Sequence, residues 1–64
     1  MDKIVTIKGK WLDLNEFVDE DGVLHTVVPY QYIAGLYRNL LPIDCYLQLE
    51  GTTIIAVCPI DNFM

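Results

Sequence analysis

The side chains of this chain that could do thiol or metal chemistry are Cys45, Cys58 and its one histidine, His25. Twelve residues separate the two cysteines, whereas structural zinc sites use ligand pairs only a few residues apart. A catalytic cysteine–histidine dyad also needs a polar group that orients the histidine, and no such pattern is visible. We therefore predict no metal site, no cofactor and no catalytic residues, so that the chain is not an enzyme.

The pairing expected near the end of the chain explains the two cysteines as packing residues. A two-residue turn at 51–52 pairs Leu49 with Ile54. The same register pairs Cys45 with Cys58, close enough for a disulfide. Nothing near the first residue resembles a secretory signal, however, and a reducing compartment keeps thiols free. We predict reduced, neighbouring cysteines on a buried strand face, with a disulfide as the alternative.

Negative charge is concentrated in one segment, residues 13–21, which contains five carboxylates and no lysine or arginine. With Gly22 at the sixth position of a calcium loop, the first ligand would have to be Phe17, so we predict no EF-hand. We predict instead a solvated turn whose acids steer a basic partner toward the protein. These turn acids are Asp19, Glu20 and Asp21.

The charge of the whole chain restricts its partners. Its net charge is −5, with four lysine and arginine residues among 64. Binding to phosphate backbones depends on such bases, so we predict no direct contact with nucleic acid. No apolar run approaches the roughly 18 residues that span a bilayer. We predict no membrane association and a cytoplasmic location, which is the host cytoplasm if the protein is viral.

The first part of the chain predicts a meander of strands. With Gly9 and Lys10 as a two-residue loop, residues 3–14 are predicted to form a hairpin that pairs Ile7 with Leu12 and has one apolar side. The reversal of the chain is therefore expected at the glycine.

Residues 17–28 extend this meander. A loop over 20–22, with its glycine in the left-handed conformation, pairs Val18 with Leu24. A capping-box pattern predicts a short helix in the same region, so strand and helix both remain open for residues 13–19.

Two prolines bound the expected helix. Pro29 suits the first position of a helix, because its missing N–H is not needed there, and Pro42 ends the helix. Strands over 43–50 and 53–58 follow. Four apolar side chains at helical spacing predict a buried stripe: Ile33, Leu36, Tyr37 and Leu40.

The predicted order is three strands, one helix and two strands in a single domain spanning residues 1–64. We predict an α+β fold in which the helix packs on a small antiparallel sheet. An OB-like five-stranded barrel has the same order of elements and is the alternative. A chain this short buries about 60% of its unfolded surface, so self-association is a further expectation.

Periodicity leaves several aromatic, apolar and basic side chains unburied on the helix and on the outer side of the last hairpin. Tyrosine and arginine are enriched among the residues that dominate protein interfaces. The predicted interface residues are Tyr32, Arg38, Tyr46, Ile55 and Val57.

These observations predict a small acidic interaction protein, an inhibitor or modulator of the kind encoded by phages and mobile elements. It would act by binding a partner protein, for example a basic one that itself binds nucleic acid. The alternative is a homo-oligomeric scaffold that binds a small ligand between its subunits. Both functions use exposed aromatic side chains, so the sequence does not choose between them.

Overall fold

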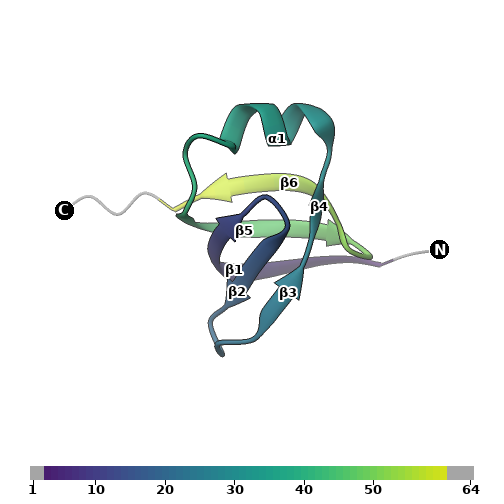
Figure 1. The fold of residues 1–64 in the computed structure, drawn as a ribbon. Coiled ribbons are helices and arrows are strands. Elements are labelled where there is room, and N and C mark those ends of the chain that lie inside the picture. Colours follow the sequence, from purple (N-terminus) through teal and green to yellow (C-terminus); the bar gives the residue numbers. More distant parts are fainter. Residues whose placement is uncertain (1–2, 61–64) are drawn as a thin grey trace.

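The computed structural model describes residues 3–60, which form a sheet-dominated structure with one short helix (Figure 1). In these residues the sheet has six strands in the order β3-β2-β1-β5-β6-β4. The elements are β1 (Ile4–Asp13), β2 (Glu16–Asp19), β3 (Leu24–Thr26), β4 (Val28–Pro29), α1 (Gln31–Tyr37), β5 (Ile43–Glu50) and β6 (Thr53–Pro59).

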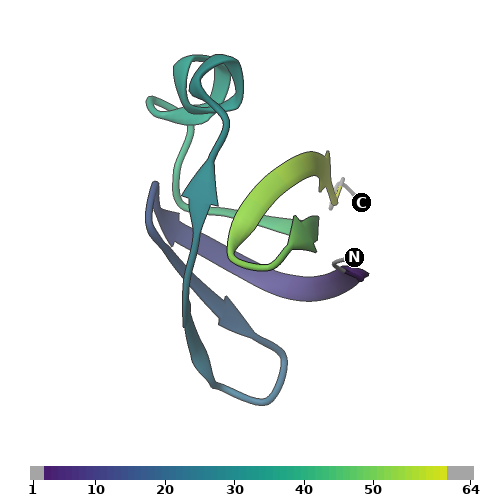
Figure 2. The same ribbon diagram turned by 90° about the vertical axis from the view of Figure 1, so that its right-hand side faces the viewer.

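The sheet curls into a nearly closed, barrel-like form because one segment reaches both of its edges. Strands β3 and β4 are separated by Val27 alone, yet β3 pairs with β2 and β4 pairs with β6. Figure 2 shows this segment rising from the hairpin at one edge to the helix above the other. The structure is thus mostly β, which agrees with the barrel alternative and roughly with the α+β order. The β4–β6 pairing is parallel, so the sheet is not wholly antiparallel as predicted.

The predicted turn at Gly9 and Lys10 is wrong, because β1 runs straight through both residues. An ideal Cβ at Gly9 would lie 2.0 Å from the backbone oxygen of Val18. The glycine therefore permits a close approach of β1 to β2 rather than a reversal. The reversal lies between Asp13 and Glu16 instead.

Side chains of the turn itself fix this reversal. Asp13 Oδ1 accepts a hydrogen bond from the N–H of Leu14 at 2.8 Å. The side-chain amide of Asn15 donates to the carbonyl of Val27 at 2.9 Å, which ties the turn to the segment between β3 and β4. The following residues form β2, so the strand alternative for this region is confirmed.

The β2–β3 hairpin follows its predicted register. Val18 is paired with Leu24, and Gly22 has a φ of 82°, the left-handed conformation expected of it. His25 lies opposite Phe17 in the same hairpin. Val27 interrupts the strand, since it is fully buried and donates its N–H to the carbonyl of Asn15.

Helix α1 is shorter than predicted. Pro29 ends β4, and the helix begins two residues later at Gln31 and stops at Tyr37. Of the predicted stripe, Ile33 is buried and Tyr37 is half-buried against Trp11, with ring centroids 5.6 Å apart. Leu36 is instead 64% exposed on the outer side of the helix, and Leu40, which lies beyond the helix end at Tyr37, is 58% exposed.

The β5–β6 hairpin has nearly the predicted bounds but a different register beyond its tip. Leu49 pairs with Ile54 as predicted, and then the register shifts by one residue of β6. Cys45 consequently lies opposite Pro59, and Cys58 opposite Tyr46, so the predicted cysteine pair is wrong. Cys45 is buried, Cys58 is exposed, and both thiols are free.

The core lies inside the curled sheet and is closed by one helical residue. Along β5 every second side chain is buried, which is the pattern of a strand with one face on a core. No helix within residues 3–60 is long and apolar enough to cross a membrane. The buried core side chains are Trp11, Phe17, Val27, Ile33, Cys45, Leu47, Leu49 and Ile54.

Candidate interaction site

The structure divides the predicted binding residues among three places. One group lies in a groove between α1 and β6, to which Arg38 is adjacent as the residue that caps the helix. Tyr46 lies on the outer face of β5, and the turn acids join β2 to β3. The groove residues among the predicted set are Tyr32, Ile55 and Val57.

The groove between α1 and β6 has a volume of about 260 Å³. From the helix it is lined by Tyr32 and Leu36, both about two-thirds exposed, and by Ile33 and Tyr37 at its base. From the strand it is lined by residues 55–57, which are half-buried. We call this site the α1–β6 groove. Its lining side chains are aliphatic or tyrosine, and about half of the exposed lining is polar, so it suits a partner that offers both apolar side chains and hydrogen-bonding groups.

Val57 does not lie on the outer side of the hairpin, as was predicted, because the register shift turns it over. It pairs with Leu47, a core residue of β5, and packs against the core cluster. Its remaining exposed surface lines both the groove and a hollow on the outer face of β5. Ile55 is the extra residue at the register shift, since Leu49 pairs with Ile54 and Gln48 with Ala56.

The outer face of β5 forms a second, shallower hollow. Tyr46 is 41% exposed there and lies beside Thr6, Gln48 and Cys58. The ammonium of Lys8 lies 5.8 Å from the centroid of the Tyr46 ring, within the range of a cation–π contact. This contact occupies part of the tyrosine surface that sequence reasoning assigned to a partner.

Hydrogen bonds to the carboxylate of Asp19 hold the acidic turn in place. Asp19 Oδ1 accepts hydrogen bonds from the N–H groups of Asp21 and Val23, at 2.9 and 3.0 Å. Asp19 Oδ2 lies 2.7 Å from His25 Nε2. The hydrogen bond with His25, followed by the backbone bond from Val23, holds the pKa of Asp19 below its ordinary value of 3.8.

Glu20 is also engaged, although more loosely. Its carboxylate lies 3.5 Å from the ammonium of Lys8, and both side chains are well exposed. Exposed ion pairs of this kind add little stability. Of the three turn acids, Asp21 is the one whose side chain makes no ion pair or hydrogen bond within residues 3–60. The turn therefore presents two exposed carboxylates, Glu20 and Asp21, while Asp19 builds the turn.

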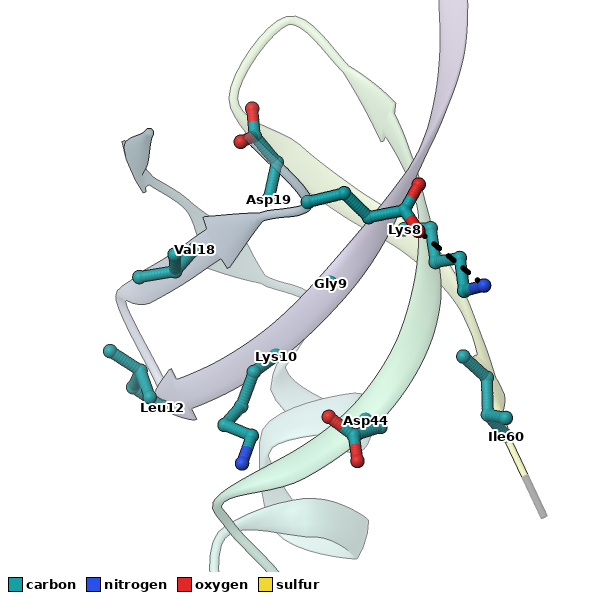
Figure 3. A pocket seen from close by; sticks show the side chains of 9 residues that line it. Lys8, Gly9, Lys10, Leu12, Val18, Asp19, Asp44 and Ile60 are labelled. Atoms are coloured by element: carbon teal, nitrogen blue, oxygen red, sulfur yellow. Dashed lines mark ion pairs between the residues drawn. The ribbon is translucent and has the colours of Figure 1, made fainter. Parts of the chain in front are cut away.

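A wider hollow lies over the crossing of β1 with β2 and β5 (Figure 3). It has a volume of about 540 Å³, and Gly9 forms part of its floor. Lys8 and Lys10 line it together with three carboxylates, and Lys10 is paired across the strands with Asp44. Because opposite charges alternate around it, this hollow concentrates neither sign and offers no defined ion site.

Thiol and metal chemistry find little support in the described residues. Burial raises the pKa of Cys45 to about 11, with the charge of Asp44 as a lesser cause. Its thiol is therefore protonated near neutral pH and enclosed in the core. No three His, Cys, Asp or Glu side chains in residues 3–60 are grouped so that they could hold a metal ion.

Sequence reasoning missed Leu36 as a groove residue, because its helical spacing placed it in the buried stripe. No local signal excluded it, because residues 31–41 leave room for about three turns before Pro42, whereas the helix stops at Tyr37. No family model, curated protein or solved structure matches this chain.

Proposed function

We propose that this protein is a non-enzymatic interaction protein, an inhibitor or modulator that acts by binding a partner protein through the α1–β6 groove. The observation that carries the proposal is the exposure of large aromatic and aliphatic side chains beside a groove that is lined by side chains of the same kinds. Tyr32 and Leu36 are 65% and 64% exposed on the helix that forms one wall.

The aromatic content of this region supports a protein partner. The rings of Tyr30 and Tyr32 stack with centroids 6.5 Å apart at the start of α1. Tyrosine provides a large contact area with few rotatable bonds and a hydroxyl that stays hydrated at the rim. Two stacked tyrosines beside the α1–β6 groove have the combination of a less polar centre and a polar rim that protein interfaces show.

Charge supports a basic partner. The net charge of −5 attracts positively charged proteins, and the exposed turn acids lie away from the groove, at the tip of the β2–β3 hairpin in Figure 1. Charges outside the contact region accelerate encounter without being part of the final complex. Basic proteins that bind nucleic acid are one class that meets this requirement.

Photo-crosslinking inside the source cell tests the proposal. A photoreactive amino acid placed at position 36 lies at the groove, and the same amino acid placed at position 4 is equally exposed but lies at the start of β1. We expect position 36 to give a covalent product with one other protein, and position 4 to give none with it. A Tyr32→Glu substitution should abolish that product.

Two results would overturn the proposal. Crosslinks from position 36 that join only copies of this chain would favour the homo-oligomeric scaffold. Equal crosslinking of the same partner from positions 4 and 36 would show that the groove is not where binding occurs.

A further inference from the structure

Strand β6 has a free edge where it faces the α1–β6 groove. On one side β6 pairs with β5 along its length. On the other side, within residues 3–60, β4 pairs only with Thr53 and Ile54. The part of β6 beyond Ile54 therefore has one unpaired edge, and Figure 1 shows α1 running above it.

The polar groups on this edge can be assigned from one hydrogen bond. The N–H of Ile60 donates to the carbonyl of Asp44 in β5 at 3.0 Å. Backbone groups alternate sides along a strand, so the N–H groups of Cys58 and Ala56 also face β5. The N–H and C=O of Val57 therefore point away from β5, toward the groove, where they are available to a further strand. Pro59 offers a carbonyl alone, because proline has no N–H.

The size of the groove indicates what can fill it. Pockets for small-molecule ligands have volumes of about 300–1,000 Å³, and this one has about 260 Å³. It suits single apolar side chains better than an entire organic ligand. A free strand edge beside a groove that accepts side chains is the arrangement that binds extended peptides, because backbone bonds give affinity and side chains give specificity.

We propose that an extended segment of the partner protein binds here by adding a strand to β6 at Val57, with its apolar side chains between β6 and α1. This inference rests on the proposed function and specifies its mode of binding. The segment carries apolar residues at alternate positions, so that one face enters the groove. Lysine or arginine flanks it, because this chain has a net charge of −5.

The same charge disfavours a second copy of this chain as the occupant. Two copies joined edge to edge would bring two charges of −5 together, and like charges oppose association.

A synthetic peptide of alternating valine and threonine with paired lysines at both ends is a suitable probe. In the free protein labelled with ¹⁵N, we expect the Val57 amide to exchange rapidly with solvent, and those of Ala56 and Cys58 slowly. Saturation with the probe should slow exchange at Val57 by about tenfold or more, because one hydrogen bond is formed. The amides of Ala56 and Cys58 should change little.

Two N-methylated probes provide the matched control. One is methylated on the valine nitrogens and the other on the threonine nitrogens. Alternate side chains fix the register, so only one of the two sets of N–H groups can face β6. We expect one methylated probe to lose affinity by about tenfold for each lost hydrogen bond and the other to bind like the parent.

Substitutions in the protein test the groove itself. Leu36→Glu should weaken probe binding by at least about tenfold, whereas Leu40→Glu should change it less than about twofold. Both residues are mostly exposed, so the fold survives either change, and Leu40 does not line the groove.

Strand addition is overturned by any of three results: no saturable binding at millimolar probe, equal binding of both methylated probes, or unchanged exchange at Val57 in the saturated complex. Each result leaves the proposed function standing if position 36 still crosslinks to one other protein. Probe-induced dimerisation through β6 would identify a second copy as the occupant and would also overturn the inference.

Discussion

Gly9 shows how the absence of a side chain can decide the path of two strands. The backbone of β2 passes so close that an added Cβ would meet the Val18 oxygen at 2.0 Å and the Asp19 Cα at 2.7 Å. Both neighbours are backbone atoms, which cannot rotate away. The close approach lets β1 pair with β5 on one side and with β2 on the other.

Replacing Gly9 with alanine should lower the free energy of unfolding by about 1–3 kcal/mol or more, because backbone must shift to relieve the clash. Gly35 is the matched control, since it lies in α1 with nothing within 4 Å of an added Cβ. Gly35→Ala should raise the free energy of unfolding by about 0.5–1 kcal/mol through helix propensity. Urea denaturation of both variants measures the difference, and equal effects would contradict this role of Gly9.

Asp19 is the turn acid whose environment differs most from solvent. Its carboxylate accepts two backbone N–H groups and lies 2.7 Å from His25 Nε2, which must act as the donor to a charged carboxylate. These bonds lower the pKa of Asp19 in the folded state. The native carboxylate thus binds a proton less readily than the unfolded one, so it stabilises the fold above pH 3.8.

This stabilisation should disappear as the pH falls through the lowered pKa of Asp19. We expect Asp19→Asn to be less stable than the parent at pH 7, and the difference to shrink toward pH 2 as the pH falls through the lowered pKa of Asp19. Asp21→Asn is the control, because its exposed side chain makes no comparable bonds within residues 3–60. Denaturation at the two pH values measures both. A destabilisation by Asp19→Asn that persists unchanged at pH 2 would show that shape rather than charge matters.

At the scale of elements, the turns at Gly22 and Gly51 were predictable, whereas the turn expected at Gly9 and the long-range placement were not. The β2–β3 register and the bounds of β5 follow from their turns, in which a glycine sets the reversal. The single-residue shift in β6 arises where that strand pairs with β4 and packs on the core, and no local sequence pattern predicts it. For the same reason the groove residues Tyr32 and Ile55 were predicted as exposed, but not as neighbours across a groove.

The shifted register gives the two cysteines different reactivities. Cys58 is exposed, whereas Cys45 is buried with its pKa raised to about 11. A thiol reagent at pH 7.5–8 should therefore label about one thiol per native chain and both in denaturant, since the thiolate is the reactive species. Mass spectrometry should locate the native label on Cys58. Rapid native labelling of both thiols, or of neither without a reductant, would contradict the register.

At the scale of the whole molecule, the exposed turn acids and the α1–β6 groove occupy different regions. Exposed acids at the β2–β3 tip lie far along the sheet from α1, as Figure 1 shows. In the proposed complex the acidic turn attracts the partner over long range, and the α1–β6 groove makes the short-range contacts. The charge balance was predictable from composition, but the separation of the turn acids from the α1–β6 groove required the fold.

Neutralising the exposed turn acids should slow association with the partner and leave dissociation nearly unchanged. Glu20→Gln with Asp21→Asn removes two charges and spares Asp19, which holds the turn together. The association rate should also depend less on salt, because screening acts on exposed charges. Stopped-flow measurements at several salt concentrations give both rates. A loss of binding caused by faster dissociation would instead make the acidic turn the primary contact.

The most direct test of the proposed interface is a map of amide chemical-shift changes. The ¹⁵N-labelled protein is titrated with the free partner protein that crosslinking identifies. We expect the largest changes at Tyr32, Leu36 and Ile55, because these residues line the α1–β6 groove and not the hollow on the outer face of β5. Changes centred on Lys8 and Tyr46, with the groove residues unaffected, would place binding on the outer face of β5 and contradict the proposal.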